Sequence, residues 1–315
     1  MSVLFDPNQA EKEPLAGDAS SRRYTRLRHG DQTMMLMQDP DGDITLFARL
    51  ARHLTGLGLS APVIYARDTA KGEMLLEDLG DGLIARLSTD AETEKRLYLA
   101  ATDALIALHQ HPAPAGLTVA TPDVLAQMID LAFTHYCDAP DALPTAVDAL
   151  RPALERYAQP ADVMILRDYH AENILWLPDR TGPARAGLLD FQDALQGHRA
   201  YDLISLLEDA RRDVRPATVV ACISHYLTAT GLAGGDFRAS LAVLGAQRNL
   251  RILGVFARLA RTRGKPHYID LIPRVWGHLQ TDLRHPALAP LRAVLSALPQ
   301  PTPDHLDRLK TCPTP

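Results

Sequence analysis

The sequence predicts an α+β protein with two lobes, a small antiparallel β lobe containing one helix and a larger, mainly helical lobe. Three observations support this fold class. The first 80 residues hold short strand-like runs separated by turn residues, and from Thr93 onward apolar residues recur at helical spacing. Residues 163–191 interrupt the helical pattern with two apolar runs. We therefore expect an N-terminal β-rich lobe over residues 1–80 and a C-terminal lobe over residues 81–315.

The first lobe is expected to begin with strands and to contain one helix between them. A turn at residues 29–32 contains Gly30 and separates two of the strands, and the apolar spacing of residues 44–58 predicts a helix that ends in glycines. Residues 77–82, EDLGDG, join the lobes and are expected to act as a hinge. The predicted strands are PLAG (14–17), RRYTRLR (22–28), TMMLMQD (33–39), APVIYARD (61–68) and GEMLLEDLG (72–80).

The second lobe has its clearest amphipathic segment at residues 95–111, KRLYLAATDALIALHQH. Residues 286–315 contain seven prolines. Because proline interrupts regular helices, we expect this tail to cover the surface without contributing a core.

The composition limits the class of protein. A chain of 315 residues with 46% hydrophobic and 23% charged residues is typical of a soluble globular protein. No apolar run approaches the roughly 18 residues that a membrane span needs, and acidic residues interrupt the N-terminus, so we expect a cytoplasmic protein with no membrane partner. The three cysteines form no CxxC pair, which argues against a disulfide framework or a structural zinc site.

The charge is distributed unevenly along the chain. Residues 201–315 carry 15 Lys and Arg against 9 Asp and Glu (+6), whereas residues 1–200 carry 18 against 29 (−11). The C-terminal arginines are spread along helical patterns without interleaved aromatic residues, so we expect no nucleic-acid partner. A small anionic ligand stays compatible with this charge, and nothing in the sequence indicates an obligate protein partner.

Polar residues gather in LRDYHAENILWL, residues 166–177, immediately before an apolar run. If a turn near Thr181 and Gly182 lets the two apolar runs pair as a hairpin, Asn173 at the start of one strand lies beside Asp190 at the end of the other. An amide oxygen and a carboxylate suit Mg²⁺, which takes its remaining ligands from water and substrate phosphates. Asp168 precedes the hairpin and can accept a proton from a hydroxyl group. These residues are the parts of a phosphoryl-transfer site; the alternative is that they only cap turns.

With these motifs the sequence resembles the aminoglycoside phosphotransferase and choline kinase superfamily, whose bilobal fold is similar to that of protein kinases. The resemblance covers nearly the whole chain. It implies ATP and Mg²⁺ as cofactors, Asp168 as the catalytic aspartate, and Asn173 and Asp190 as metal ligands. Asp202, in YDLISLL, matches an aspartate that supports the catalytic loop, a role compatible with the alternative of a helix N-cap.

The resemblance also implies nucleotide contacts, for which simple turns are the alternative. The loop GDASSRRY lies where the fold covers the ATP phosphates, and Glu77 and Leu79 match the inter-lobe linker that binds adenine. Two departures from the family pattern stand out: TMMLMQD lacks the usual phosphate-binding lysine, for which Arg22 or Arg23 is a candidate replacement, and Leu166 stands where histidine is common. The candidate contacts in the loop are Gly17, Asp18, Ala19, Ser20, Ser21, Arg22 and Arg23.

Three segments, GDASSRRY, DFQDALQGHRAYDLISLLEDARRD and QRNLRILGVFARLA, resemble a narrower group, the kinases that phosphorylate the C1 hydroxyl of N-acetylmuramate and N-acetylglucosamine in peptidoglycan recycling. The partner would then be a small amino sugar. An arginine suits the lactyl carboxylate of N-acetylmuramate, although solvent-facing arginines are the alternative, and His170 can instead bond its own loop. The candidate acceptor contacts are His170, Arg211, Gln247, Arg248 and Arg251.

Two other functions stay open. An aminoglycoside or choline-like acceptor would use the same reaction, but an enzyme for polycations should surround its acceptor with acidic side chains, and residues 201–315 carry +6. A nucleotide-binding pseudokinase is suggested by the missing lysine and opposed by the intact set of Asp168, Asn173 and Asp190.

Overall fold

The structure is a computed structural model that describes residues 5–7, 9–15, 22–40 and 42–311. Its contacts divide the chain into two compact units, residues 1–108 with 171–193, and residues 109–170 with 194–315. Packing thus groups residues 81–108 and the 171–193 segment with the β-rich part. The division into a nucleotide-binding lobe (1–80) and a helical lobe (81–315) concerns function as well as packing, and it stays a prediction.

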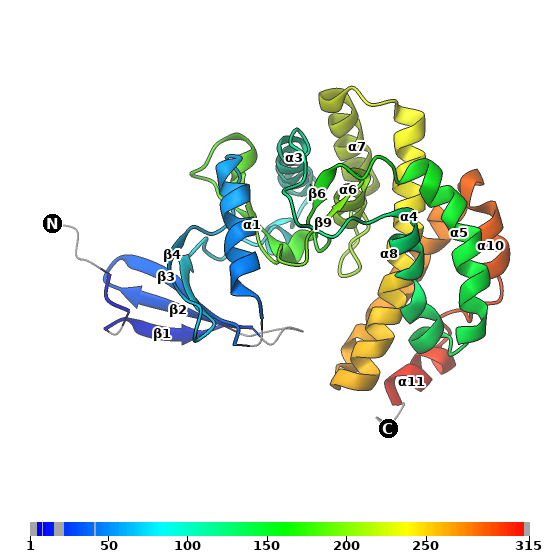
Figure 1. The fold of residues 1–315 in the computed structure, drawn as a ribbon, viewed down its shortest axis with the longest axis horizontal. Helices are drawn as coiled ribbons and strands as arrows, with labels where there is room; N and C mark the ends of the chain where they lie inside the picture. Colours follow the sequence, from blue (N-terminus) through cyan, green and yellow to red (C-terminus); the bar gives the residue numbers. More distant parts are fainter. Residues whose placement is uncertain (1–4, 8, 16–21, 41, 312–315) are drawn as a thin grey trace. The chain divides into compact units, whose positions relative to one another are not determined.

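The first unit is organised around an antiparallel sheet, which within the described residues has five strands in the order β1-β2-β3-β5-β4. The predicted turn between β2 and β3 is confirmed, because β2 ends at His29, β3 begins at Gln32, and Gly30 has a φ of +59°. Figure 1 shows α1 (Ile44–Gly56) beside these strands. The strands are β1 (Glu11–Pro14), β2 (Arg23–His29), β3 (Gln32–Gln38), β4 (Ile64–Asp68) and β5 (Glu73–Glu77).

The first strand differs from its prediction. PLAG was expected over residues 14–17, but β1 covers Glu11–Pro14, and residues 16 and 17 lie outside the described part. Every residue of β1 is exposed, so its sequence lacks the alternation that marks a strand. Its backbone pairing with β2, in which Glu11 lies across from Arg28, makes it a strand, and the ion pair of Glu13 with Arg28 supports the pairing.

A helix and a hairpin complete the core of the first unit. The side chain of Asp43 caps α1 by accepting hydrogen bonds from the backbone N–H groups of Thr45 and Leu46. The apolar face of α1 is buried together with side chains from the sheet. The other elements of this unit are α2 (Ile84–Leu87), α3 (Ala91–Leu108) and the hairpin of β7 (Ile174–Trp176) and β8 (Ala186–Leu188).

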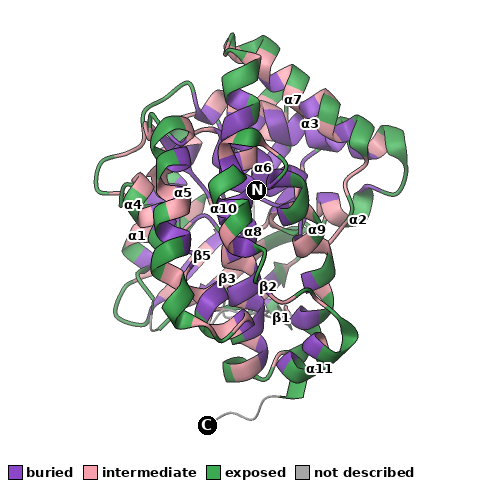
Figure 2. Cartoon of the chain, turned by 90° about the vertical axis from the view of Figure 1, so that its right-hand side faces the viewer, coloured by how far each residue is buried: buried purple, intermediate pink, exposed green. Residues whose placement is uncertain are grey.

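The second unit is mainly helical and packs around the long helix α8 (Gly234–Arg263), which contacts α5, α6, α9 and α11. Figure 2 shows buried stretches along α8. One short antiparallel pair joins β6 (Val163–Ile165), which directly precedes the loop at residues 166–173, to β9 (Leu195–Gly197), which comes later in the chain. The other helices are α4 (Pro122–Gln127), α5 (Leu143–Tyr157), α6 (Ala200–Leu207), α7 (Pro216–Thr230), α9 (Ile272–Asp282), α10 (Ala289–Leu295) and α11 (Pro303–Thr311), with a π-helix at Ala132–Tyr136.

The proline-rich tail does contribute a core, so that prediction was wrong. It forms α10 and α11, and Leu288, Leu291 and Leu309 are buried. Pro290 and Pro303 stand in the first turns of these helices, where a missing N–H removes no intrahelical bond. The prolines therefore begin helices here.

Two further observations bear on the compositional expectations. Cys137 and Cys222 form no disulfide within the described residues. Over the same part of the chain, none of the helices combines the length and the apolar character that crossing a bilayer requires. The cytoplasmic location stays a prediction.

Candidate active site

The loop after β6 presents one exposed carboxylate between buried neighbours. Leu166 is 2% exposed and Tyr169 is also 2% exposed, whereas Asp168 between them is exposed. Arg167 has a φ of +70°, a left-handed conformation that is uncommon for residues other than glycine. Such strain is maintained where the surrounding structure holds the backbone, and functional loops are frequent examples.

Helix α6 holds this loop through two of its side chains. Asp202, which is fully buried, accepts hydrogen bonds from the backbone N–H groups of Leu166 and Arg167. One turn further on, the hydroxyl of Ser205 donates to the carbonyl of Arg167 at 3.1 Å. These contacts support the loop-bracing role proposed for Asp202. They reach the backbone of Leu166, so the side chain at that position is not required for them.

The pKa of Asp202 leads to a prediction about pH. Burial raises this pKa to about 7, against the opposing effect of the two N–H donors, while Asp168 raises it further and Arg248 lowers it. The folded state therefore binds one more proton than the unfolded state between pH ~4 and ~7. The free energy of unfolding should fall as the pH rises through this window, whereas activity should rise as the carboxylate forms.

Asp202→Asn should remove both effects and lower kcat by about 10- to 100-fold, because the two N–H groups bind different oxygens of Asp202 and the amide replaces one of these acceptors with an NH2 donor, so the loop shifts. Unfolding by urea at pH 4.5 to 7.5 and the pH profile of kcat test this. Glu208 and Asp282, whose pKa values burial also raises, are present in both proteins, so the difference between the two curves isolates Asp202. Identical curves for the variant and the wild type would contradict the role.

The predicted hairpin is confirmed in the first unit. β7 and β8 pair antiparallel with Ile174 opposite Leu188, and the backbone N–H of Leu189 donates to the carbonyl of Asn173 at 3.0 Å. Asp190 follows Leu189 directly and has a φ of +57°. The hairpin therefore brings Asn173 to the strand end from which Asp190 projects.

Asp190 is anchored through the residue that follows it. Phe191 is fully buried and packs against Phe47 of α1, with ring centroids 4.8 Å apart. The Asp190 side chain itself is 45% exposed and accepts a hydrogen bond from the Gln192 amide at 2.7 Å. The amide oxygen of Asn173 and the carboxylate of Asp190 are hard donors that fit Mg²⁺, for which one or two protein ligands usually suffice when substrate phosphates supply others.

Arg22 brings a positive charge to this carboxylate. Its Nη1 lies 3.7 Å from Oδ1 of Asp190, and its Nε donates to the buried carboxylate of Asp39 at 2.7 Å. The carboxylate of Asp39 lies against the backbone of Gly42, where there is room for it because glycine has no side chain; a Cβ at this position would lie 2.0 Å from an oxygen of Asp39. Arg23 is exposed, and Gly17, Asp18, Ala19, Ser20 and Ser21 of the same loop lie outside the described residues. Of the two candidate replacements for the missing lysine, Arg22 is the one beside the proposed metal ligand.

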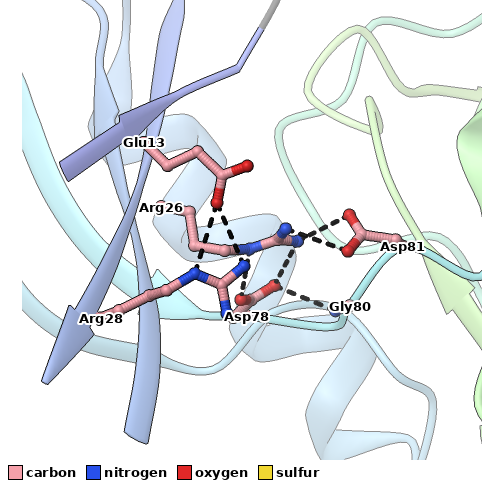
Figure 3. A network of polar contacts seen from close by, with 6 residues as sticks. All are labelled: Glu13, Arg26, Arg28, Asp78, Gly80 and Asp81. Carbon is pink, nitrogen blue, oxygen red and sulfur yellow. Dashed lines mark hydrogen bonds and ion pairs between the residues drawn. The ribbon is translucent and has the colours of Figure 1, made fainter. Parts of the chain in front are cut away.

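The linker at residues 77–82 is tied to the sheet by a network around Arg26 (Figure 3). Arg26, which is 4% exposed, donates to both oxygens of Asp78 and both oxygens of Asp81. Asp78 in turn accepts from the backbone N–H of Gly80 at 3.0 Å. These contacts hold the predicted linker, which includes the proposed adenine contacts Glu77 and Leu79, against the sheet. Glu77 is itself engaged, because its carboxylate binds Arg180 and its backbone N–H donates to Val63.

Arg26→Met should destabilise the first unit by about 3 kcal/mol, because it leaves the Asp78 carboxylate buried, at 5% exposure, without its main counter-charge. Arg28→Met is the matched control. Arg28 lies two residues along the same strand and pairs with Glu13 on the surface (Figure 3), where an ion pair contributes about 0–1 kcal/mol. Urea unfolding of the two variants measures the difference, and equal midpoints would show that the network does not stabilise the fold.

The candidate acceptor contacts all belong to the second unit, and most are engaged with protein atoms. Gln247 is fully buried and donates its amide to the carbonyl of Leu125 at 2.9 Å. His170 is buried, with Nε2 3.2 Å from Nη1 of Arg211. Because the guanidinium can only donate, Nε2 is the accepting nitrogen, and burial lowers the pKa of His170 well below its usual value. This imidazole is therefore neutral.

Residues that sequence reasoning missed support the site from a distance. Asp39 holds Arg22, the Asp78 and Asp81 pair holds Arg26, and Arg180 holds Glu77. No sequence signal marks these pairs, because their partners are 17, 52, 55 and 103 residues apart.

Comparison with known proteins identifies the family of the chain. Residues 12–241, most of its length, match the model of the phosphotransferase enzyme family. The chain belongs to this family. It is therefore a phosphotransferase, and the family implies ATP as phosphoryl donor together with a divalent metal. The resemblance to this family in the sequence is confirmed.

Individual relatives cover nearly the whole phosphotransferase. The N-acetylmuramate/N-acetylglucosamine kinase of Caulobacter vibrioides is 39% identical over 90% of each chain. The protein of the same description from Pseudomonas aeruginosa is 31% identical, with 92% of this chain and 89% of the relative covered. A choline/ethanolamine kinase family protein from Mesorhizobium loti has a TM-score of 0.64 at 18% identity over 91% and 92% of the two chains. That similarity shows the fold, so the bilobal α+β, kinase-like fold class is confirmed.

Proposed function

We propose that this phosphotransferase uses ATP and Mg²⁺ to phosphorylate the anomeric C1 hydroxyl of N-acetylmuramate and N-acetylglucosamine. The observation that carries the proposal is the 39% identity, over 90% of both chains, to a kinase described as acting on these two sugars. The basic balance of residues 201–315 also suits an acceptor that carries a carboxylate better than a polycation. Phosphorylation of these sugars fits the recovery of peptidoglycan fragments.

Each proposed catalytic residue has one task. Asp168, exposed on a loop that Asp202 and Ser205 hold, orients the sugar hydroxyl and accepts its proton. Asn173 and Asp190 would hold Mg²⁺, which neutralises charge on the phosphates when bound. Arg22 adds a second positive charge at Asp190, in place of the lysine that the family usually carries on the third strand.

The protein contributes to this reaction mainly by positioning the reacting groups and neutralising their charge, because phosphoryl transfer passes through a loose transition state. The loop at Asp168 is proposed to position the sugar, and Arg22 with the metal is proposed to neutralise the charge. Left-handed backbone at Arg167 and Asp190 aims the two carboxylates, and the buried residues that follow them, Tyr169 and Phe191, keep them in place. Glu77 and Leu79 at the linker are the proposed adenine contacts.

The test is an assay of the purified protein with ATP, Mg²⁺ and each acceptor in turn. We expect turnover with N-acetylmuramate and N-acetylglucosamine, loss of turnover with EDTA, and a ³¹P signal that couples to the C1 proton. Kanamycin and choline complete the panel. If kanamycin or choline is phosphorylated and the sugars are not, the proposed acceptor class is wrong. A phosphate at another carbon would overturn the anomeric assignment. ATP binding without any transfer would indicate a pseudokinase.

A further inference from the structure

A groove lies between α4 and α8 in the second unit. It has a volume of about 480 Å³, which is within the range of small-molecule sites. Its floor and walls combine apolar and polar side chains, so it suits a sugar better than a purely apolar ligand. The lining residues are Asp123, Val124, Gln127, Met128, Asp130 and Arg251.

Arg251 is the basic residue of this groove, and its charge is poorly compensated. Its Nη1 donates a long hydrogen bond, 3.4 Å, to the carbonyl of Met128, and within the described residues Arg251 forms no ion pair. Burial lowers the pKa of Arg251, and the charges of Arg167 and Arg258 lower it further, against the opposing effect of Asp130. A half-buried guanidinium in such surroundings is stabilised by an added anion.

Neither of the two carboxylates that line the groove forms an ion pair with Arg251 in the described part of the chain. Asp123 is paired with Arg151 of α5 at 2.8 Å, and Arg151 also binds Asp148. Asp130 lies near enough to act on Arg251 but makes no ion pair with it in the described part of the chain. The groove therefore offers one guanidinium with unused donors, together with an acidic side chain, Asp130, that suits a sugar hydroxyl.

The remaining candidate arginines are used internally. Arg248 is 6% exposed, donates to the carbonyl of Glu208 and lies beside a buried acid pair. In that pair Glu208 and Asp282 both accept from the amide of Asn249, at 2.7 and 3.0 Å. Burial and the charge of Glu208 raise the pKa of Asp282, whereas Arg248 lowers the pKa of both acids, so Arg248 serves as their counter-charge. Arg211 is bound to His170.

The groove and the loop that carries Asp168 are linked through α6, because Asp202 and Ser205 of α6 bind the backbone of Arg167 and α6 packs against α8, the helix that carries Arg251. Tyr201 of α6 is buried, and burial raises the pKa of its phenol; the charge of Asp168 raises this pKa further and the charge of Arg251 lowers it. Arg167, which precedes Asp168 directly, also acts on Arg251. An acceptor with its reacting hydroxyl at Asp168 can therefore extend toward Arg251.

We propose that Arg251 is the specificity residue for the acceptor, and that it binds the lactyl carboxylate of N-acetylmuramate through its two-pronged guanidinium. The inference rests on the proposed function and adds the basis for discrimination between its two sugars. N-acetylglucosamine lacks the lactyl group, so Arg251 contributes to the binding of one acceptor and not of the other.

The test compares kcat/KM for the two sugars in the wild type and in Arg251→Met, which keeps an unbranched side chain and removes the charge. We expect kcat/KM for N-acetylmuramate to fall by about 10- to 100-fold, mainly through KM, which corresponds to the loss of a charge-assisted hydrogen bond. For N-acetylglucosamine we expect a change below about threefold. Arg251→Lys, which keeps the charge but not the fork, should lie between the two.

Arg263→Met is the matched control. Arg263 is exposed, lies about three turns further along α8 and changes the net charge equally, so its removal should leave the ratio of the two kcat/KM values unchanged. An equal loss with both sugars in Arg251→Met, or no loss with either, would overturn the inference while leaving the proposed function in place. Wild-type protein that phosphorylates neither sugar would overturn both. Circular dichroism of each variant separates misfolding from lost recognition, and if Arg251→Met does not fold, the Arg251→Lys ratio decides.

Discussion

Asp168→Asn is expected to lower kcat by about 10³-fold, with little change in the KM for the sugar. The amide keeps the size of the side chain but cannot accept the proton of the attacking hydroxyl, and a positioned general base typically contributes about 10²- to 10⁴-fold. The loop itself should persist, because Leu166 and Arg167 are held by Asp202 and not by Asp168. Steady-state kinetics with saturating ATP and Mg²⁺ measure the effect.

A conservative substitution elsewhere in the second unit provides the control for Asp168. Asp148 lies on α5, is 72% exposed and pairs with Arg151 on the surface. Asp148→Asn should leave kcat within about twofold of the wild type, since exposed ion pairs contribute little. Turnover of Asp168→Asn within tenfold of the wild type would show that another group takes the proton.

Asp190→Ala is expected to abolish measurable transfer, a loss of about 10³-fold or more, because the carboxylate is one of only two proposed protein ligands for the metal. The fold should survive this change. Arg22 keeps its 2.7 Å contact with Asp39, and Phe191 keeps its packing against Phe47. Asp190→Asn, which retains a neutral oxygen, should recover part of the activity at raised Mg²⁺ concentration.

Asp179→Ala is the matched control for the metal ligand. Asp179 is an exposed acid of the same hairpin, in the turn between β7 and β8. Its removal should change neither kcat nor the concentration of Mg²⁺ needed for half-maximal rate. If Asp190→Ala kept wild-type turnover, or if both variants shifted the Mg²⁺ requirement equally, the metal assignment would be wrong.

The β7–β8 hairpin was predictable from residues that are close together in the sequence. Two apolar runs with a Gly- and Pro-bearing turn predict that β7 and β8 pair, and this pairing alone brings Asn173 and Asp190 to one strand end. The α1 helix and the β2–β3 turn were predictable for the same reason, since periodicity and glycine chemistry act over only a few residues. The error at β1 has the opposite cause: a fully exposed edge strand has no apolar alternation, and its partner strand alone defines it.

Local patterns in the sequence were thus sufficient for the α+β fold class, and short motifs together with the family resemblance were sufficient for the phosphotransferase activity, because both depend on short segments. The roles of Asp168, Asn173 and Asp190 stay predictions. Only the tertiary structure decided which arginine side chains are paired with carboxylates of the protein and which can bind a ligand. Arg22 lies beside Asp190, and Arg26 forms an ion pair with Asp78 of the linker. Arg248 lies beside Glu208, whereas Arg251 lines a groove. The physical reason is that a guanidinium's role depends on the carboxylates and solvent around it, and these come from residues far away in the chain.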